Sequence, residues 1–251
     1  MIPGMEHPFE TAAQNLANAR RSGIPTERSP EASRPTTTEE ALRIQRRAFE
    51  LLGEPLGGWK CSVPAGNNMI VAPLPSSTIH RSSPCPVIPH EGRAQIEPEI
   101  AFYLKYDLEP RPTPYSEDEV REAVGETRLV LELMASRYAD HGAVTFLEAL
   151  ADSMRHQGMF VGPVLESPFE RALESFHLTI DGVFDKEVRH PNGHPLKPVH
   201  WLANFLSGRG ETLRAGKLIT TGSYAGIIEV PMGVPLNFTY GSLGGFTVEF
   251  K

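Results

Sequence analysis

The chain has 251 residues, 40% hydrophobic and 22% charged, which is enough to bury a substantial core and argues against wholesale disorder. Its formal net charge of -7, with no long basic stretch, argues against nucleic acid or an anionic membrane surface as a partner, because both require clustered lysine and arginine. The 23 prolines and 22 glycines predict many turns and short strands and exclude a helical bundle.

Two amphipathic helices are predicted in the first part of the chain. Apolar residues recur at helical spacing over residues 9–22, and Gly23 is placed to end this helix. A capping box formed by Thr37 and Glu40 precedes a second apolar stripe. We therefore assign residues 1–56 to an N-terminal helical region.

Short strands and two further helices are predicted in the rest of the chain, residues 57–251. Strands are expected at 59–63, 69–72, 96–106 and 128–134, helices at about 116–124 and 198–207, and further strands between 218 and 250. Helices at the front and scattered short strands behind them predict an α+β fold with a curved or rolled sheet, without βαβ alternation.

Cysteine usage and the apolar stretches indicate the compartment. Cys61 and Cys85 do not form a CxxC pair, so a zinc ribbon and a thioredoxin-like site are not expected. Residues 1–7 lack the basic and apolar regions of a signal peptide, and no stretch approaches the roughly 18 apolar residues of a membrane span. We expect a cytoplasmic protein with reduced thiols and no membrane partner.

Three acids within apolar runs form the most informative pattern in the chain. Glu97 and Glu99 point to the same face if residues 96–106 are a strand, and Glu132 lies between leucines in a second predicted strand. Carboxylates held this close repel one another, and a hard divalent ion is their natural neutraliser. All-oxygen ligation suits Mg²⁺ or Mn²⁺ better than zinc, and three protein ligands leave positions open for a chelating substrate.

Structural interpretations of the acids and of Lys60 remain open on pattern alone. Glu132 could pair with an arginine such as Arg137, while Glu97 and Glu99 could lie on a solvated sheet face. Lys60, beside a tryptophan in a glycine-flanked strand, is either a desolvated group that donates a proton or anchors a substrate, or an ordinary lysine whose ammonium reaches solvent.

Two other groups of residues are candidates for the site. The Thr221-Gly222-Ser223 turn offers hydroxyls and backbone N–H groups to a carboxylate, although a simple strand-ending turn explains it equally well. The histidines show no metal-binding spacing, and His141 and His156 are expected on the surface.

Several segments, in this order and spacing, resemble the hydratase and decarboxylase branch of the fumarylacetoacetate hydrolase superfamily. They are residues 16–25, 41–45, 58–60, 97–102, 131–137, 201–204 and 213–223. The resemblance implies a rolled, distorted mixed β-sheet, a divalent metal held by Glu97, Glu99 and Glu132, and an active-site lysine at Lys60. It also implies a homo-oligomer.

The same resemblance implies a metal-dependent lyase that hydrates a small 2-oxo or 2-hydroxydienoic acid in the degradation of aromatic compounds. Decarboxylation or carbon–carbon hydrolysis at the same site, and a non-catalytic subunit that supports a partner enzyme, are the alternatives. A catalytic histidine is the feature that distinguishes the hydrolase.

The sequence departs from the branch in two segments that bear on the substrate. Residues 69–75 lack the acid that the family commonly carries after the lysine, and residues 152–158 differ from the family's loop. Arg155 and His156, in the second segment, could bind the second carboxylate of a dioate. Gly222 and Ser223 are expected near the first carboxylate of the substrate.

Overall fold

The N-terminal helices form as their sequence patterns predict. The computed structural model describes residues 8–66, 68–166 and 173–251. Its first two helices are α1 (Pro8–Ser22) and α2 (Thr38–Leu52). The capping box of α2 is present, because the Thr37 side chain accepts from the Glu40 N–H while the Glu40 side chain accepts from the Thr37 N–H. A glycine in the left-handed region ends the helix.

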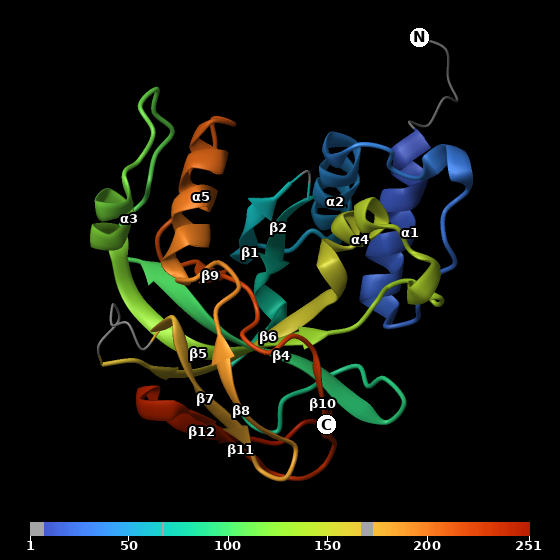
Figure 1. Ribbon diagram of the computed structural model, residues 1–251. Helices are drawn as coiled ribbons and strands as arrows, with labels where there is room; N and C mark the ends of the chain where they lie inside the picture. Colours follow the sequence, from blue (N-terminus) through green and yellow to red (C-terminus); the bar gives the residue numbers. More distant parts are fainter. Residues whose placement is uncertain (1–7, 67, 167–172) are drawn as a thin grey trace.

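A curled, mixed sheet of eight strands follows (Figure 1). Its strands are β1 (Leu56–Ala65), β2 (Asn68–Pro75), β3 (Ile79–His80), β4 (Arg93–Leu104), β5 (Val124–Met134), β6 (His156–Val164), β9 (Leu218–Thr220) and β10 (Ile228–Pro231). The order is β2-β1-β9-β4-β5-β6-β3, with β10 also paired to β4. Because β1–β9 and β3–β6 are parallel and the other pairs antiparallel, the sheet is mixed and the predicted α+β fold is confirmed.

A second, antiparallel sheet packs beside the first and was not predicted in full. It has the order β12-β11-β7-β8 and comprises β7 (Ser175–Ile180), β8 (Phe184–Arg189), β11 (Leu236–Tyr240) and β12 (Gly245–Val248). The sheets meet where Phe246 packs on Phe160 with ring centroids 5.4 Å apart and where the Tyr240 hydroxyl donates to the Val130 carbonyl. In Figure 1 this sheet lies at the bottom of the view.

Three further helices and several short turns complete the described part. The helices are α3 (Glu117–Ala123), α4 (Phe146–Ala151) and α5 (Leu196–Ser207), and the 3-10 turns are 31–33, 76–78, 141–143, 153–155 and 241–243. Figure 1 shows α4 beside α1 and α2, with α3 and α5 on the other side of β1 and β2. Helix α4 was missed, although Thr145 and Glu148 form a capping box that signals it.

The helices and the main sheet share one hydrophobic core. Leu16 of α1 and Ile44 of α2 belong to the same buried cluster as Ile96 and Phe102 of β4. This core includes residues on both sides of position 56. The division of the chain into residues 1–56 and 57–251 stays a prediction. No helix among the described residues is long and apolar enough to cross a membrane.

Candidate metal centre and active site

Strand β4 carries the site at a gap in the main sheet. On one side β4 pairs with β5 along its length, whereas on the other side β10 pairs with residues 93–96 and β9 with residues 101–103. Pro98 lies in the interval between them, where its missing N–H costs no ladder hydrogen bond. The loop after β9 fills the gap, and the Tyr224 N–H donates to the Pro98 carbonyl.

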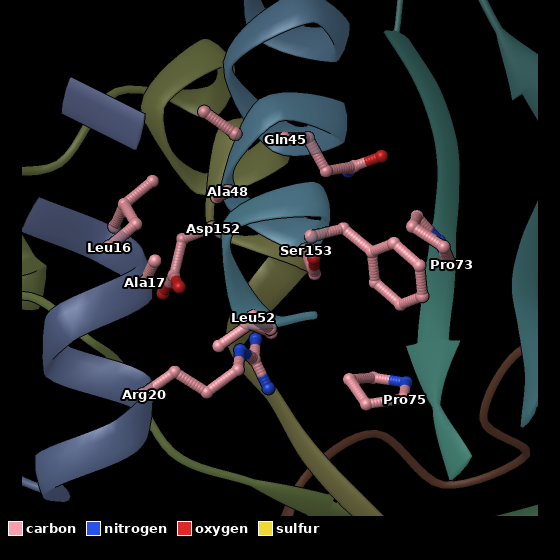
Figure 2. Close-up of a pocket in the computed structure, with 12 residues that line it drawn as sticks. Leu16, Ala17, Arg20, Gln45, Ala48, Leu52, Pro73, Pro75, Asp152 and Ser153 are labelled. Atoms are coloured by element: carbon pink, nitrogen blue, oxygen red, sulfur yellow. The ribbon is translucent and has the colours of Figure 1, made fainter. Parts of the chain in front are cut away.

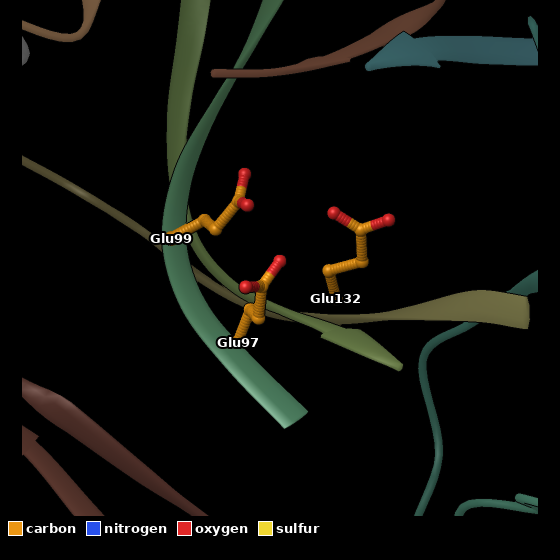
Figure 3. Close-up of side chains that lie close together, drawn as sticks. All are labelled: Glu97, Glu99 and Glu132. Atoms are coloured by element: carbon orange, nitrogen blue, oxygen red, sulfur yellow. The ribbon is translucent and has the colours of Figure 1, made fainter. Parts of the chain in front are cut away.

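The three predicted acids converge at this place. Glu97 and Glu99 project from the same face of β4, and Glu132 lies directly opposite Glu97 on β5. One carboxylate oxygen of each lies within 4.8 Å of the others, and Figure 3 shows the carboxylates turned toward a common space. Glu99 is 1% exposed, so its carboxylate does not lie on a solvated sheet face, and Glu97 beside it is half-buried.

Glu99 is held by the loop that fills the gap. Its Oε2 accepts hydrogen bonds from the Thr220 hydroxyl, from the Thr221 N–H at 3.1 Å and from the Gly222 N–H at 2.9 Å. Its other oxygen takes part in none of these bonds. The turn thus binds a carboxylate, as its residues suggested, but this carboxylate belongs to Glu99, so these two N–H groups are not available to a substrate.

Burial and mutual repulsion alter the protonation of this cluster. Burial, followed by the charges of Glu132 and Glu97, raises the pKa of Glu99 to about 8. Burial and the Glu132 charge likewise raise the pKa of Glu97 to about 7. Without a cation, Glu99 therefore keeps its proton at neutral pH, and Glu97 is about half protonated.

Lys60 of β1 and His156 at the start of β6 hold the third acid. The Lys60 ammonium donates to Glu132 Oε1 at 2.6 Å, and His156 Nδ1 lies 2.9 Å from the same oxygen. Burial opposes the charge on Glu132, but Lys60 and His156 outweigh it and lower the pKa of this carboxyl. Burial also opposes the charge on Lys60, yet the three glutamates raise its pKa, so the lysine keeps its proton.

These contacts answer two questions that the sequence left open, one about Lys60 and one about Glu132. Lys60 is only 7% exposed, so it is not a lysine whose ammonium reaches solvent. Glu132 does not pair with Arg137, which instead forms a buried ion pair with Asp152.

The donor set fits a hard divalent cation. Glu132 Oε2 is buried and has no hydrogen-bond partner among the described residues, although a buried carboxylate oxygen is costly to leave unpaired. It belongs to a carboxylate that stays ionised and lies against two others whose protons a cation would displace. Three carboxylates without cysteine or histidine match Mg²⁺ and Mn²⁺ better than zinc.

His156 lies behind Glu132 and was wrongly expected on the surface. It is fully buried, it does not line the cavity described next, and burial lowers its pKa to about 4. The neutral ring can donate from Nδ1 to Glu132, so it orients the carboxylate. His141, by contrast, is exposed as expected.

The three acids open into a cavity of about 570 Å³. Its wall includes Lys60, Arg155, Gly222 and Ser223, so these four predicted site residues share it with the acids. Ile70, from the segment that lacks the family's acid, makes this part of the wall apolar. The volume is sufficient for a small organic acid.

A strained loop brings Arg155 to this cavity. Three consecutive residues other than glycine have left-handed backbones: Ser153 (φ 56°), Met154 (φ 52°) and Arg155 (φ 65°). The Arg137 guanidinium braces both ends of the turn, donating to the carbonyl oxygens of Asp152 and His156 at 2.9 and 2.7 Å. Such backbones cost free energy and persist only where the surroundings hold them.

A second, smaller cavity of about 20 Å³ lies behind this loop, between α1 and α2 (Figure 2). Its wall includes Arg20, Gln45 and Asp152. This volume holds about one water molecule, so it is not a substrate site.

Sequence reasoning missed three residues that shape the site: Thr220, Gln95 and His156 in its buried position. Gln95 could have been found, because it precedes Glu97 by two residues and shares its face of β4. Thr220 is 121 residues from its partner Glu99, and His156 is 24 residues from its partner Glu132. No local sequence pattern predicts either contact.

Comparison with known proteins finds a similar sequence among curated enzymes. The chain is 30% identical over 166 residues to 2-keto-4-pentenoate hydratase of Paraburkholderia xenovorans, a match that covers 62% of this chain and 59% of that protein. The matched part thus spans less than two thirds of the curated relative. No family model matches the chain.

Solved structures agree on the fold. A 4-oxalocrotonate decarboxylase from Pseudomonas putida G7, complexed with magnesium and adipate, superposes with a TM-score of 0.78 over 97% of both chains at 21% identity. A yeast protein of the fumarylacetoacetate hydrolase family superposes with a TM-score of 0.51 at 15% identity, covering 77% of this chain and 91% of its own. These superpositions show that the chain has the fold of the fumarylacetoacetate hydrolase family.

Proposed function

We propose that this protein is a divalent-metal-dependent lyase that hydrates a small 2-hydroxy-2,4-dienoic or 2-oxo-4-enoic acid in the degradation of aromatic compounds. The observation that carries the proposal is the buried carboxylate triad with the unpartnered Glu132 Oε2, open to a cavity of small-molecule size. Glu97, Glu99 and Glu132 would hold Mg²⁺ or Mn²⁺. When bound, the ion would supply Lewis-acid polarisation of a substrate oxygen.

Lys60 is a positive charge in the wall of the cavity, beside the three acids. Its raised pKa keeps it protonated, and one of its three N–H donors is directed at Glu132. The remaining donors can bind a carboxylate or enolate oxygen of the substrate. The geometry therefore favours an anchoring role for Lys60 over proton abstraction.

Water addition needs a substrate whose double bonds are conjugated to the anchored oxygen. The apolar wall, with Val63, Ile70 and Ile227, suits the hydrocarbon part of such a dienoate. Decarboxylation at the same site is the second candidate, because the decarboxylase superposes over nearly the whole chain and a second match to such an enzyme is 40% identical over 58 residues.

Carbon–carbon hydrolysis is less favoured. It needs a histidine that reaches a water molecule in the cavity, whereas the ring of His156 is fully buried behind Glu132. A non-catalytic subunit would have no need for raised carboxyl pKa values or a buried lysine at the cavity wall. Cytoplasmic location and homo-oligomeric assembly are proposed with the family.

Metal content of the purified protein tests the site. Glu97→Gln should lose bound Mg²⁺ or Mn²⁺, whereas the control Glu126→Gln, an acid of β5 paired with Arg128, should retain it. Unchanged metal binding in Glu97→Gln would refute the assignment of the ligands.

Turnover then separates the reactions. The metal-loaded protein is incubated with 2-hydroxy-2,4-pentadienoate and with 4-oxalocrotonate, and loss of dienol absorbance is compared with release of CO₂. Hydration without CO₂ supports the proposal, and CO₂ release supports the second candidate. If the metal-loaded protein turns over neither compound, the lyase proposal is rejected.

A further inference from the structure

His190 is a buried histidine beside the metal centre, and the proposed function does not yet use it. It directly follows β8 and is 1% exposed. Its backbone N–H donates to the Glu174 carbonyl at 2.8 Å, and its ring packs edge-on against Tyr224 with ring centroids 5.0 Å apart. These contacts give the imidazole a fixed position in the fold.

Both ring nitrogens of His190 have a backbone partner. Nδ1 accepts from the Asn192 N–H at 3.2 Å, so the ring hydrogen lies on Nε2, which donates to the Thr221 carbonyl at 3.1 Å. Burial lowers the pKa of this histidine to about 4, which keeps the ring in the neutral form that the two bonds require. The two partners therefore select one tautomer of the ring.

The Thr221 carbonyl needs the donor that His190 supplies. Thr221 is fully buried, so its carbonyl has no access to bulk water. A buried carbonyl that lacks a hydrogen bond is costly. Loss of the imidazole would therefore remove the reason for this carbonyl to point where it does.

The same peptide group also binds Glu99. The Thr221 carbonyl and the Gly222 N–H belong to one planar trans peptide group, in which they point in opposite directions. The carbonyl accepts from His190, whereas the N–H donates to Glu99 Oε2 at 2.9 Å. His190 and Glu99 thus hold opposite ends of one peptide group. Rotation of that group by half a turn would place a carbonyl oxygen where Glu99 now meets an N–H.

Glycine at position 222 makes this orientation easy to lose. Gly222 has a φ of 110°, and glycine adopts positive and negative φ about equally readily, so the change in φ that accompanies such a rotation costs little. Pro191 also contacts the turn, because its Cγ lies 3.5 Å from the position that a Cβ would take at Gly222. Residues 190–191 therefore hold the turn through a hydrogen bond and through packing.

We propose that His190 is a positioning residue of the metal centre, whose Nε2–H holds the peptide group between Thr221 and Gly222 so that the Gly222 N–H is directed at Glu99. This inference rests on the proposed function, in which Glu99 is a metal ligand. A carboxylate that is held through one oxygen presents the other in a fixed direction. His190 should therefore raise the metal affinity without touching the metal.

Mn²⁺ binding by variants of the full-length protein tests the proposal. His190→Leu removes both ring contacts, and His190→Asn keeps an acceptor near Nδ1 but has no donor that reaches Thr221. Both should weaken Mn²⁺ binding about tenfold in isothermal titration calorimetry. His190→Gln, whose amide nitrogen can replace Nε2, should stay within about threefold of the wild type. The control His177→Leu, on an exposed histidine of β7 beside Asp185 and Glu187, should bind Mn²⁺ as the wild type does.

Two further backgrounds separate positioning from general damage to the fold. In Glu99→Gln, position 99 has no carboxylate to orient, so adding His190→Asn should weaken Mn²⁺ binding less than about twofold. In His156→Leu, which acts through Glu132, the same change should still cost about tenfold. A tenfold loss in the Glu99→Gln background would indicate general damage and overturn the proposal.

The wild-type protein separates this inference from the proposed function. If it binds no Mn²⁺, the assignment of the ligands is rejected and the role of His190 with it. If it binds Mn²⁺ and His190→Asn binds equally well, only the role of His190 is rejected. A His190→Gln protein as weak as His190→Asn would also overturn the assignment of the Nε2 donor. These two polar variants provide the test if His190→Leu does not fold.

Discussion

Metal affinity should rise steeply with pH, because metal binding must displace protons from two carboxyls. The raised pKa values of about 8 for Glu99 and about 7 for Glu97 mean that both are largely protonated at pH 6. A metal ligand must be deprotonated, so these protons compete with the cation. Glu132 is already ionised at this pH and adds nothing to the dependence.

The size of the effect follows from the two pKa values. Between pH 6 and pH 8 the competition relaxes by about fiftyfold for Glu99 and about tenfold for Glu97, on the order of 500-fold together. Above pH 8 the affinity should level off. The slope on a logarithmic plot should approach two per pH unit at the acid end and decrease toward zero at the basic end.

Calorimetric titration with Mn²⁺ or Mg²⁺ in buffers of different ionisation enthalpy measures both affinity and proton release. The control is Glu99→Gln, which weakens binding but should also reduce the pH dependence to the tenfold contribution of Glu97. An affinity that stays constant between pH 6 and pH 8, or binding without proton release, would refute the reasoning from burial and repulsion.

Four further predictions follow from the same contacts. The stability of the metal-free protein should fall as pH rises from about 4.5 through 8, because folded Glu99 keeps a proton that the unfolded chain releases, and thermal unfolding with Mg²⁺ present should abolish this fall. Thr220→Val removes a donor to Glu99 and should weaken metal binding about tenfold, with Thr220→Ser as the control. His156→Leu should weaken metal binding about tenfold to a hundredfold, whereas His156→Asn, which can replace the Nδ1 donor, should retain most of the affinity. Arg137→Met leaves Asp152 buried and unpaired and should reduce the free energy of unfolding by about 3–5 kcal/mol, measured by urea denaturation.

The parts of the fold that the sequence predicted well are those with local signals. The capping boxes at Thr37 and Ser116 begin helices where expected, because each satisfies exposed N–H groups through residues three positions apart. The second sheet was missed in part, since strands β7 and β8 have short patterns that also suit exposed loops. The second sheet packs on the first through contacts between distant parts of the chain, such as that between Phe160 and Phe246, and the sequence does not show these contacts.

In the candidate site, too, the features with local sequence signals were predicted and the long-range contacts were not. A period of two residues was enough to place Glu97 and Glu99 on one face, and the apolar flanks indicated that Glu132 needed a partner. The identity of that partner could not be read from the sequence, because Lys60 lies 72 residues away and the pair forms only when β1 and β5 lie in one sheet. The Gly222 N–H donates to Glu99, which lies 123 residues away, so this partner could not be read from the sequence either.

The proline between the two acids connects these observations. A strand inside a sheet normally excludes proline, yet Pro98 lies in β4, so the sequence marks a place where one neighbouring strand is absent. That absence lets the loop after β9 approach the strand from the side, and its N–H groups at Thr221 and Gly222 then reach Glu99. An uninterrupted ladder would use those donors for backbone pairing. The Glu-Pro-Glu sequence therefore encodes both the carboxylates and the opening in the sheet through which one of them is held.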